Sequence, residues 1–166
     1  MRRFNFLLIA VVIGLLCTGG LILAGCLKSN NSSPCTSKAV TVDEPAILAY
    51  LATNNITGYV KHSSGLYYKI DSLGSAVSPN SSSKVYVTYT GKFTDNTVFD
   101  SVSDASKTGW TLGTLLQGWQ IGLPLIGKGG RIHLYIPSAL GYGCTITGPI
   151  PANSVLVFDI TLVDVL

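Results

Sequence analysis

The side chains that could do chemistry in this sequence are mostly aromatic and aliphatic rather than ionisable. Seven of them fall at positions expected to face inward: Tyr89, Phe99, Leu116, Trp119, Tyr142, Ile150 and Phe158. Residues of this kind usually form a hydrophobic core. However, the two tyrosine hydroxyls need partners when buried, and Asp100 adds a carboxylate to the set. Because an apolar cavity with a few converging polar groups is the general form of a ligand site, both a core and a pocket stay open.

Residues for acid–base, nucleophilic or metal chemistry are scarce. His62 lies in a polar turn and His133 is expected on the outer face of a strand, so both are interpreted as surface residues. No group of His, Cys and carboxylates has metal-ligand spacing, and no nucleophile elbow, phosphate loop or dinucleotide fingerprint occurs. Neither a metal nor a cofactor is therefore expected, and hydrolysis by a catalytic triad is disfavoured.

The segments that must position the aromatic residues follow a strand pattern with one helical interruption. Alternating apolar residues predict strands at residues 65–70, 85–91, 130–137 and 154–166. A hairpin is expected over residues 93–101, with Asp95 and Asn96 at its tip. Residues 118–126 have helical spacing, and Pro124 limits the length of that helix. The sum is an α+β domain, an antiparallel sheet with one short helix lying across it.

A second helix is expected near the start of the domain, within residues 43–58. Asp43 is suited to cap it, Pro45 to its first turn, and Ile47, Leu48 and Leu51 form an apolar stripe. The helix is too short for a dimerising coiled coil. We expect it to dock on the main domain, which spans residues 59–166.

The first 25 residues have the order of a secretory signal: two arginines, a long apolar run and small residues at the end. The small residues before Cys26 resemble the lipobox of bacterial lipoproteins, in which Cys26 would be acylated and become the mature N-terminus. An uncleaved membrane anchor is the alternative, because the apolar run is long. Residues 26–42 are polar and interrupted by Pro34, which predicts a flexible tether between the membrane and the domain.

Charge and cysteine content narrow the remaining possibilities. Removing residues 1–25 takes away two arginines and no acid, so the net charge falls from +3 to about +1. A near-neutral domain lacks the basic surface that nucleic acid requires, so no nucleic-acid partner is expected. Outside the cytoplasm Cys35 and Cys144 are expected to form a disulfide, with free or buried thiols as the alternative.

Four ordered blocks are similar to FKBP-type peptidyl-prolyl cis-trans isomerases: VYVTYTGKFTDNTVFDS, LLQGWQIGLPLIGKGG, IPSALGYG and GPIPANSVLVFDITLVDV. They cover roughly residues 84–166, and SGLYYKID resembles the strand that precedes this core in bacterial members. The resemblance implies an FKBP-like antiparallel sheet wrapped around one short helix. The whole chain resembles a lipoprotein form of the family of the Bacteroidetes type.

The resemblance also implies roles for individual residues. Trp119 would be the floor on which a substrate proline ring sits, and Tyr142 and the Leu116 N–H would donate hydrogen bonds to substrate carbonyls. Asp100 would be the polar residue at the pocket edge. The walls would be formed by Tyr89, Phe99, Leu115, Leu116, Ile150 and Phe158.

Two departures from the family pattern put the pocket shape in doubt. An aromatic wall that some members place before the helix falls near Thr108, with Trp110 following as a candidate core replacement. A basic partner for the aspartate is absent, because SVSDASKTG contains no arginine.

The function implied is isomerisation of X-Pro bonds in folding polypeptides of the cell envelope, by a monomer anchored to the membrane through Cys26. A macrolide that binds FKBPs is expected to inhibit it. The alternatives are a peptide-binding module or holdase chaperone without useful turnover, and a structural lipoprotein in which the pocket is only core.

Overall fold

A computed structural model describes residues 35–166, and in this part of the chain seven strands form one antiparallel sheet. The sheet order is β1-β2-β6-β7-β3-β4, and β5 pairs separately with β3. The strands are β1 (Val60–Lys61), β2 (Tyr67–Ser72), β3 (Lys84–Lys92), β4 (Val98–Val102), β5 (Trp110–Thr111), β6 (Arg131–Ile136) and β7 (Leu156–Val165). The helices are α1 (Glu44–Thr53) and α2 (Gln117–Gly122), the latter continued by a 3-10 turn over Leu123–Leu125.

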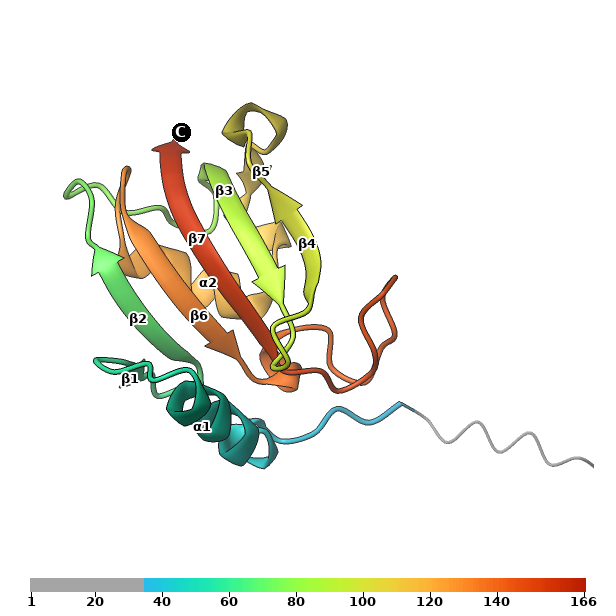
Figure 1. Cartoon of the computed structure of the whole chain (residues 1–166). Coiled ribbons are helices and arrows are strands. Elements are labelled where there is room, and N and C mark those ends of the chain that lie inside the picture. Colours follow the sequence, from blue (N-terminus) through green and yellow to red (C-terminus); the bar gives the residue numbers. More distant parts are fainter. Residues whose placement is uncertain (1–34) are drawn as a thin grey trace, which may run out of the picture. The chain divides into compact units, whose positions relative to one another are not determined.

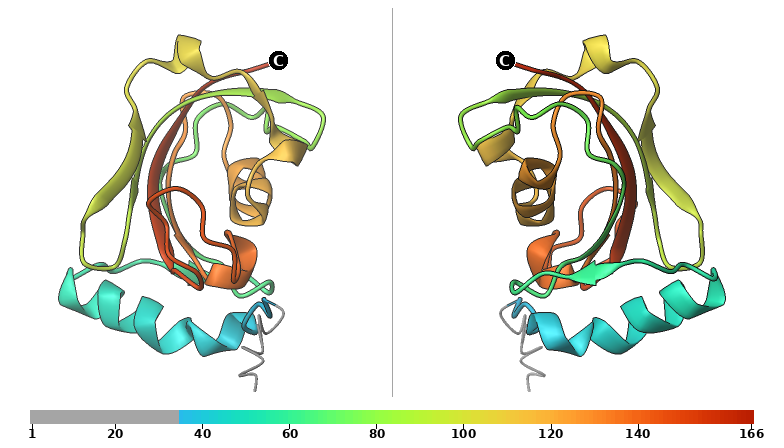
Figure 2. Two further views of the ribbon diagram at one scale, coloured as in Figure 1. Left: turned by 90° about the vertical axis from the view of Figure 1, so that its right-hand side faces the viewer. Right: turned by 90° about the vertical axis from the view of Figure 1, so that its left-hand side faces the viewer.

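The sheet curves around α2, which lies on its concave side (Figures 1 and 2). The inner face of β6 contributes Ile132, Leu134 and Ile136, all of which are fully buried. The predicted alternation is confirmed in this strand. The rest of the main core includes Val85, Val87, Leu123, Ile126, Leu156, Ile160 and Leu162.

The helix α1 packs on a second, smaller hydrophobic cluster. Its residues Ile47, Tyr50 and Leu51 are buried against Tyr67 and Tyr135. One expectation was therefore wrong in detail, because Leu48 is exposed although it was placed in the apolar stripe. On the outer face of β6, Tyr135 is buried although its neighbours on that face are not. The cause is α1 itself, which covers one end of the sheet (Figure 1).

The helix α1 ends at Thr53 rather than continuing to residue 58. Asn55 has a φ of 54°. The N–H of Ile56 donates to the carbonyl of Leu51 at 2.9 Å, which closes the helix end. A left-handed residue such as Asn55, directly after the last turn, is a common way for a helix to end.

The described part of the expected tether, residues 35–42, is mostly exposed but is attached to the domain at two places. A 3-10 helix spans Val40–Val42, and the Val40 side chain contacts the main core. Cys35 and Cys144 are joined by a disulfide, with their Cα atoms 5.5 Å apart. The expected signal sequence, Cys26 and the first part of the tether lie outside the described residues. No helix in residues 35–166 combines the length and apolar character needed to cross a membrane.

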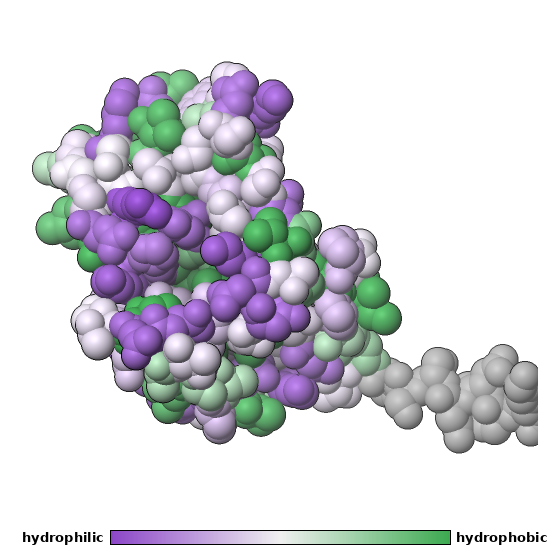
Figure 3. Space-filling view, in the orientation of Figure 1, coloured by the Kyte–Doolittle hydropathy of each residue, from purple (hydrophilic) through white to green (hydrophobic). Residues whose placement is uncertain are grey.

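The outer face of the sheet, turned away from α2, is polar (Figure 3). Arg131 forms a two-point ion pair with Asp159, at 2.9 and 2.5 Å, and His133 Nε2 lies 2.7 Å from Asp71. The hydrogen bond from His133 lowers the pKa of Asp71. The outer residues Arg131 and His133 of β6 belong to this polar network, whereas Tyr135 on the same face lies under α1.

Candidate functional site

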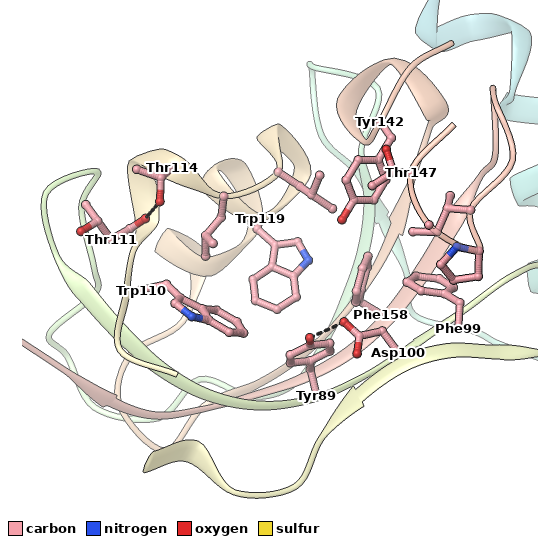
Figure 4. Close-up of a pocket in the computed structure, with 15 residues that line it drawn as sticks. Tyr89, Phe99, Asp100, Trp110, Thr111, Thr114, Trp119, Tyr142, Thr147 and Phe158 are labelled. Carbon is pink, nitrogen blue, oxygen red and sulfur yellow. Dashed lines mark hydrogen bonds between the residues drawn. The ribbon is translucent and has the colours of Figure 1, made fainter. Parts of the chain in front are cut away.

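A cavity of about 660 Å³ opens between α2 and the curved sheet (Figure 4). The structure brings all nine residues of the expected pocket to its wall: Tyr89, Phe99, Asp100, Leu115, Leu116, Trp119, Tyr142, Ile150 and Phe158. They come from β3, β4, α2, β7 and two loops. The apolar set of the sequence is therefore not wholly enclosed core, because one side of it faces an open cavity.

Trp119 lies at the bottom of this cavity, and only 4% of it is exposed. Its ring meets those of Tyr89 and Phe158 edge-to-face, with both centroid distances 5.2 Å. This geometry is favourable for aromatic pairs. The indole Nε1 has no hydrogen-bond partner among residues 35–166.

Two glycines allow α2 to approach the sheet and carry Trp119 to this position. A Cβ atom at Gly118 would lie 2.7 Å from Ile136, and one at Gly122 would lie 2.5 Å from Leu134. Such distances are too short for any larger residue unless the helix or the facing side chain is displaced. The position of the indole thus depends on the absence of two side chains.

A third glycine makes room for the aromatic wall opposite. A Cβ atom at Gly91 would lie 2.7 Å from the Phe99 ring and 2.8 Å from the Phe158 ring. These two rings meet edge-to-face at 5.6 Å. The backbone pairing of Gly91 with Asp100 places the carboxylate beside the same wall.

The hydroxyl of Tyr89 donates a hydrogen bond of 2.5 Å to Asp100 Oδ2. Burial, and then this hydrogen bond, raises the pKa of Tyr89. The phenol therefore stays protonated at neutral pH, and it holds the carboxylate at the edge of the cavity (Figure 4).

The hydroxyl of Tyr142 points into the cavity, toward the space between Trp119 and Asp100 (Figure 4). No other residue in the range 35–166 forms a hydrogen bond with it. Burial, together with the nearby charge of Asp100, raises the pKa of Tyr142. The pocket thus contains a protonated donor that is available to a ligand.

Trp110, which the sequence interpretation gave as a candidate core replacement for the missing aromatic wall, packs against the core and also lines the cavity. The pairing of β5 with β3 brings the centroid of the Trp110 ring to 6.2 Å from that of the Tyr89 ring. Thr108, by contrast, faces the backbone: its hydroxyl accepts from the Val87 N–H at 2.9 Å and donates to the Ala105 carbonyl at 2.7 Å. Since β5 has only two residues, no periodic pattern could have revealed this arrangement.

The remaining wall consists of short polar and backbone-rich positions that were not predicted: Thr111, Thr114, Thr147, Gly148 and Pro149. Among residues 35–166 no three His, Cys, Asp or Glu side chains are grouped as a metal site would require. The site therefore offers an aromatic floor and walls, one carboxylate and few hydrogen-bonding groups.

Fold and pocket together define a small α+β domain with an apolar pocket that has an indole at its bottom. A family model described as FKBP-type peptidyl-prolyl cis-trans isomerase matches residues 75–163. The chain belongs to this family.

Curated bacterial relatives agree with this assignment. An FKBP-type peptidyl-prolyl cis-trans isomerase FkpA from Aeromonas hydrophila is 39% identical over 118 residues, which is 70% of this chain and 44% of the relative. An outer membrane protein MIP from Legionella longbeachae is 38% identical over 120 residues, covering 70% and 52%. The chain thus spans about half the length of these curated relatives, or less.

Solved structures show the same fold. The crystal structure of FkpA from Escherichia coli aligns with a TM-score of 0.65 and 33% identity, covering 76% of this chain and 60% of that one. A peptidyl-prolyl cis-trans isomerase from Pseudomonas syringae aligns with a TM-score of 0.63 and 25% identity, covering 78% and 98%. The second structure is therefore similar over nearly its whole length.

Proposed function

We propose that this chain is a peptidyl-prolyl cis-trans isomerase that acts on proline-containing polypeptides in the cell envelope. The observation that carries the proposal is the available hydroxyl of Tyr142 above the buried indole of Trp119, inside a pocket of otherwise apolar walls. Membership of the family supports it.

The reaction requires little chemistry. Rotation about a peptide bond has a barrier of about 18–20 kcal/mol, because resonance gives the C–N bond double-bond character. Before proline the two isomers differ by only about 0.5–1 kcal/mol. A catalyst therefore has to lower the barrier without changing the equilibrium, and no bond is formed or broken.

The pocket can favour the twisted amide over the planar one. The twisted amide has lost resonance and with it part of the charge separation between oxygen and nitrogen. Apolar walls therefore destabilise the twisted amide less than they destabilise the planar amide. Trp119 would receive the proline ring, and Tyr142 would donate to a substrate carbonyl. Leu116 directly precedes α2, so its N–H is among those that lack a partner within the helix. This N–H would hold a second carbonyl.

The test is the cis-to-trans rate of a panel of short X-Pro peptides, with the full-length chain purified in mild detergent. The variant Tyr142→Phe keeps the ring and removes the hydroxyl, so kcat/KM should fall roughly fivefold, which corresponds to about 1 kcal/mol for one hydrogen bond. Tyr135→Phe is the matched control, because Tyr135 lies under α1 on the other face of the sheet. Its kcat/KM should be that of the wild type.

A folded wild-type chain that does not exceed the uncatalysed rate would contradict the isomerase proposal. Tryptophan fluorescence, to which Trp110 and Trp119 in the pocket both contribute, then distinguishes the alternatives when an FKBP-directed macrolide is added. Quenching would indicate a binding module or holdase with an open pocket, whereas no change would indicate that the pocket is only core.

We further propose that the chain is a lipoprotein of the Bacteroidetes type, anchored as a monomer through acylated Cys26. The lipobox-like sequence before Cys26 supports this, and one relative is named an outer membrane protein. Globomycin-type inhibition of signal processing should leave a heavier precursor, and Cys26→Ser should give the same result. Unchanged migration in both cases would exclude lipidation.

A further inference from the structure

Asp43 is a buried carboxylate that the proposed reaction does not use. Only 5% of it is exposed, and it makes no side-chain hydrogen bond to the start of α1, although the sequence predicted such a cap. Instead its Oδ2 accepts from both the N–H and the hydroxyl of Ser138, at 2.8 and 2.5 Å. Lys38 Nζ lies 4.0 Å from the other oxygen. Burying a carboxylate costs free energy unless the group is hydrogen-bonded. The bonds to Ser138 offset this cost, and they therefore hold Asp43 and Ser138 in place.

Ser138 in turn holds the backbone on both sides of Tyr142. It is fully buried and begins the 3-10 helix η5 (Ser138–Leu140). Its carbonyl accepts from the N–H of Gly141 at 3.0 Å and from the N–H of Gly143 at 2.8 Å. The residue between these two glycines is Tyr142. Asp43 is therefore linked through a single residue to the backbone that carries the pocket donor.

A second attachment lies just beyond Tyr142. The disulfide joins Cys35 to Cys144, and Ser37 contacts Gly143, which lies between Tyr142 and Cys144 in the sequence. Gly143 has a φ of +58°, and a Cβ atom there would lie 2.5 Å from Ser37 Oγ. Within this N-terminal arm, residues 35–43, the 3-10 turn Val40–Val42 lies beside η5 (Figure 2). Tyr142 is thus held between two points at which the arm is attached.

We propose that the N-terminal arm is part of the active site, with Asp43 as a positioning residue that aims the Tyr142 hydroxyl into the pocket. The inference rests on the proposed isomerase function. It assigns a functional role to residues outside the range 75–163 that the family model matches. The family domain in this chain is then completed by a segment that precedes it.

The variant Asp43→Asn removes the charge beside Ser138 and Lys38 and replaces one carboxylate oxygen by an amide NH2 group, which cannot accept a hydrogen bond. In full-length chain it should lower kcat/KM on X-Pro peptides by roughly threefold to fivefold, which is no more than the loss from Tyr142→Phe. The matched control is Glu44→Gln. This neighbouring carboxylate bonds Lys61 and Tyr67, away from the pocket, so its loss should leave kcat/KM unchanged.

A double-mutant cycle separates positioning from general destabilisation. If Asp43 acts through Tyr142, Asp43→Asn should have almost no further effect in a Tyr142→Phe background. The double variant Cys35→Ser/Cys144→Ser removes the other attachment of the arm. It should also lower kcat/KM, and that loss should likewise almost disappear in a Tyr142→Phe background. Should Asp43→Asn fail to fold, Ser138→Ala is the milder change, because it keeps the backbone hydrogen bond to Asp43.

The ring resonances of isotope-labelled Tyr142 provide a readout that does not depend on turnover. They should shift in Asp43→Asn and stay in place in Glu44→Gln. The inference would be overturned if Asp43→Asn kept the wild-type kcat/KM and left the Tyr142 resonances unshifted. It would also be overturned if Asp43→Asn lowered kcat/KM equally in the wild-type and Tyr142→Phe backgrounds. A wild-type chain without catalysis would instead overturn the proposed function, and the resonances would still decide whether Asp43 positions Tyr142.

Discussion

At the scale of single residues, two tyrosines with similar environments have different roles in the pocket. The Tyr89 hydroxyl is engaged by Asp100, whereas the Tyr142 hydroxyl has no partner in residues 35–166. One therefore fixes the carboxylate at the edge, and the other remains available to a substrate. The difference comes from the pairing of β3 with β4, which brings the Asp100 carboxylate within hydrogen-bond distance of the Tyr89 hydroxyl.

Protonation of these tyrosines predicts how activity depends on pH. Burial raises the pKa of both phenols above the ordinary value of about 10, so neither loses its proton near neutrality. We expect kcat/KM to be constant from about pH 6 to 9, with any decline only where tyrosine ionises. An uncoupled assay, in which no protease reports the isomer, measures this profile. A titration centred near pH 7 would contradict the proposed roles.

Gly91 predicts how far the aromatic wall can tolerate a change. In Gly91→Ala the new methyl group would collide with Phe99 and Phe158, so the rings must move into the pocket. We expect a higher KM and a loss of about 1–3 kcal/mol in the free energy of unfolding. The control Thr90→Ala alters the opposite face of the same strand. Equal KM values for the two variants would show that the wall does not contact substrate.

At the scale of elements, the distance between α2 and β6 sets the depth of the pocket. Gly118 and Gly122 face Ile136 and Leu134 with no space for a side chain. The helix is only six residues long, too short to be stable alone, so its conformation depends on this packing.

The variant Gly118→Ala tests that dependence. Alanine is the better helix former by about 0.8–1 kcal/mol, so helix propensity alone predicts stabilisation. We expect the reverse, a net loss of about 1–3 kcal/mol, because overpacking against Ile136 outweighs propensity. Urea unfolding measures the difference, with Gln117→Ala as the control at an exposed position of the same helix. A stabilised Gly118→Ala would mean that the helix can shift outward at little cost.

At the scale of the whole molecule, the domain combines two hydrophobic clusters with many buried phenols. Burial raises the pKa of five tyrosines: Tyr50, Tyr67, Tyr89, Tyr135 and Tyr142. Each folded phenol binds its proton more tightly than the unfolded one. Their contribution to stability is therefore complete below the unfolded pKa of about 10 and is lost as pH rises above it.

This linkage predicts alkaline unfolding. The urea midpoint should fall steadily above about pH 10, in parallel with the absorbance of ionised tyrosine. Tyr135→Phe removes one of the buried phenols and should make the decline shallower. A midpoint that stays constant while tyrosine ionises would contradict the proposed burial.

The sequence by itself determined the periodic and local features. Alternation in residues 130–137 and 154–166 predicted two central strands, since one face of each is buried and the side-chain period is two. The hairpin tip at Asp95 and Asn96 followed from turn chemistry, and Asn96 has a φ of 67°. Inward-facing positions indicated seven of the nine expected pocket residues, with Asp100 beside them. The ordered blocks that resemble FKBPs added Leu115 and the role of each residue, because the family pattern records contacts that periodicity does not.

Only the tertiary structure decided the contacts between distant segments. Trp110 lines the pocket because a two-residue strand pairs with β3, and Tyr135 is buried because α1 covers it. The link from Asp43 to Ser138 joins residues 95 positions apart. Local patterns predicted a helix cap at Asp43, since capping is the short-range use of such a residue. Its actual partner was set by chain folding that brings the N-terminal arm to the loop carrying Tyr142, and no local pattern contains that information.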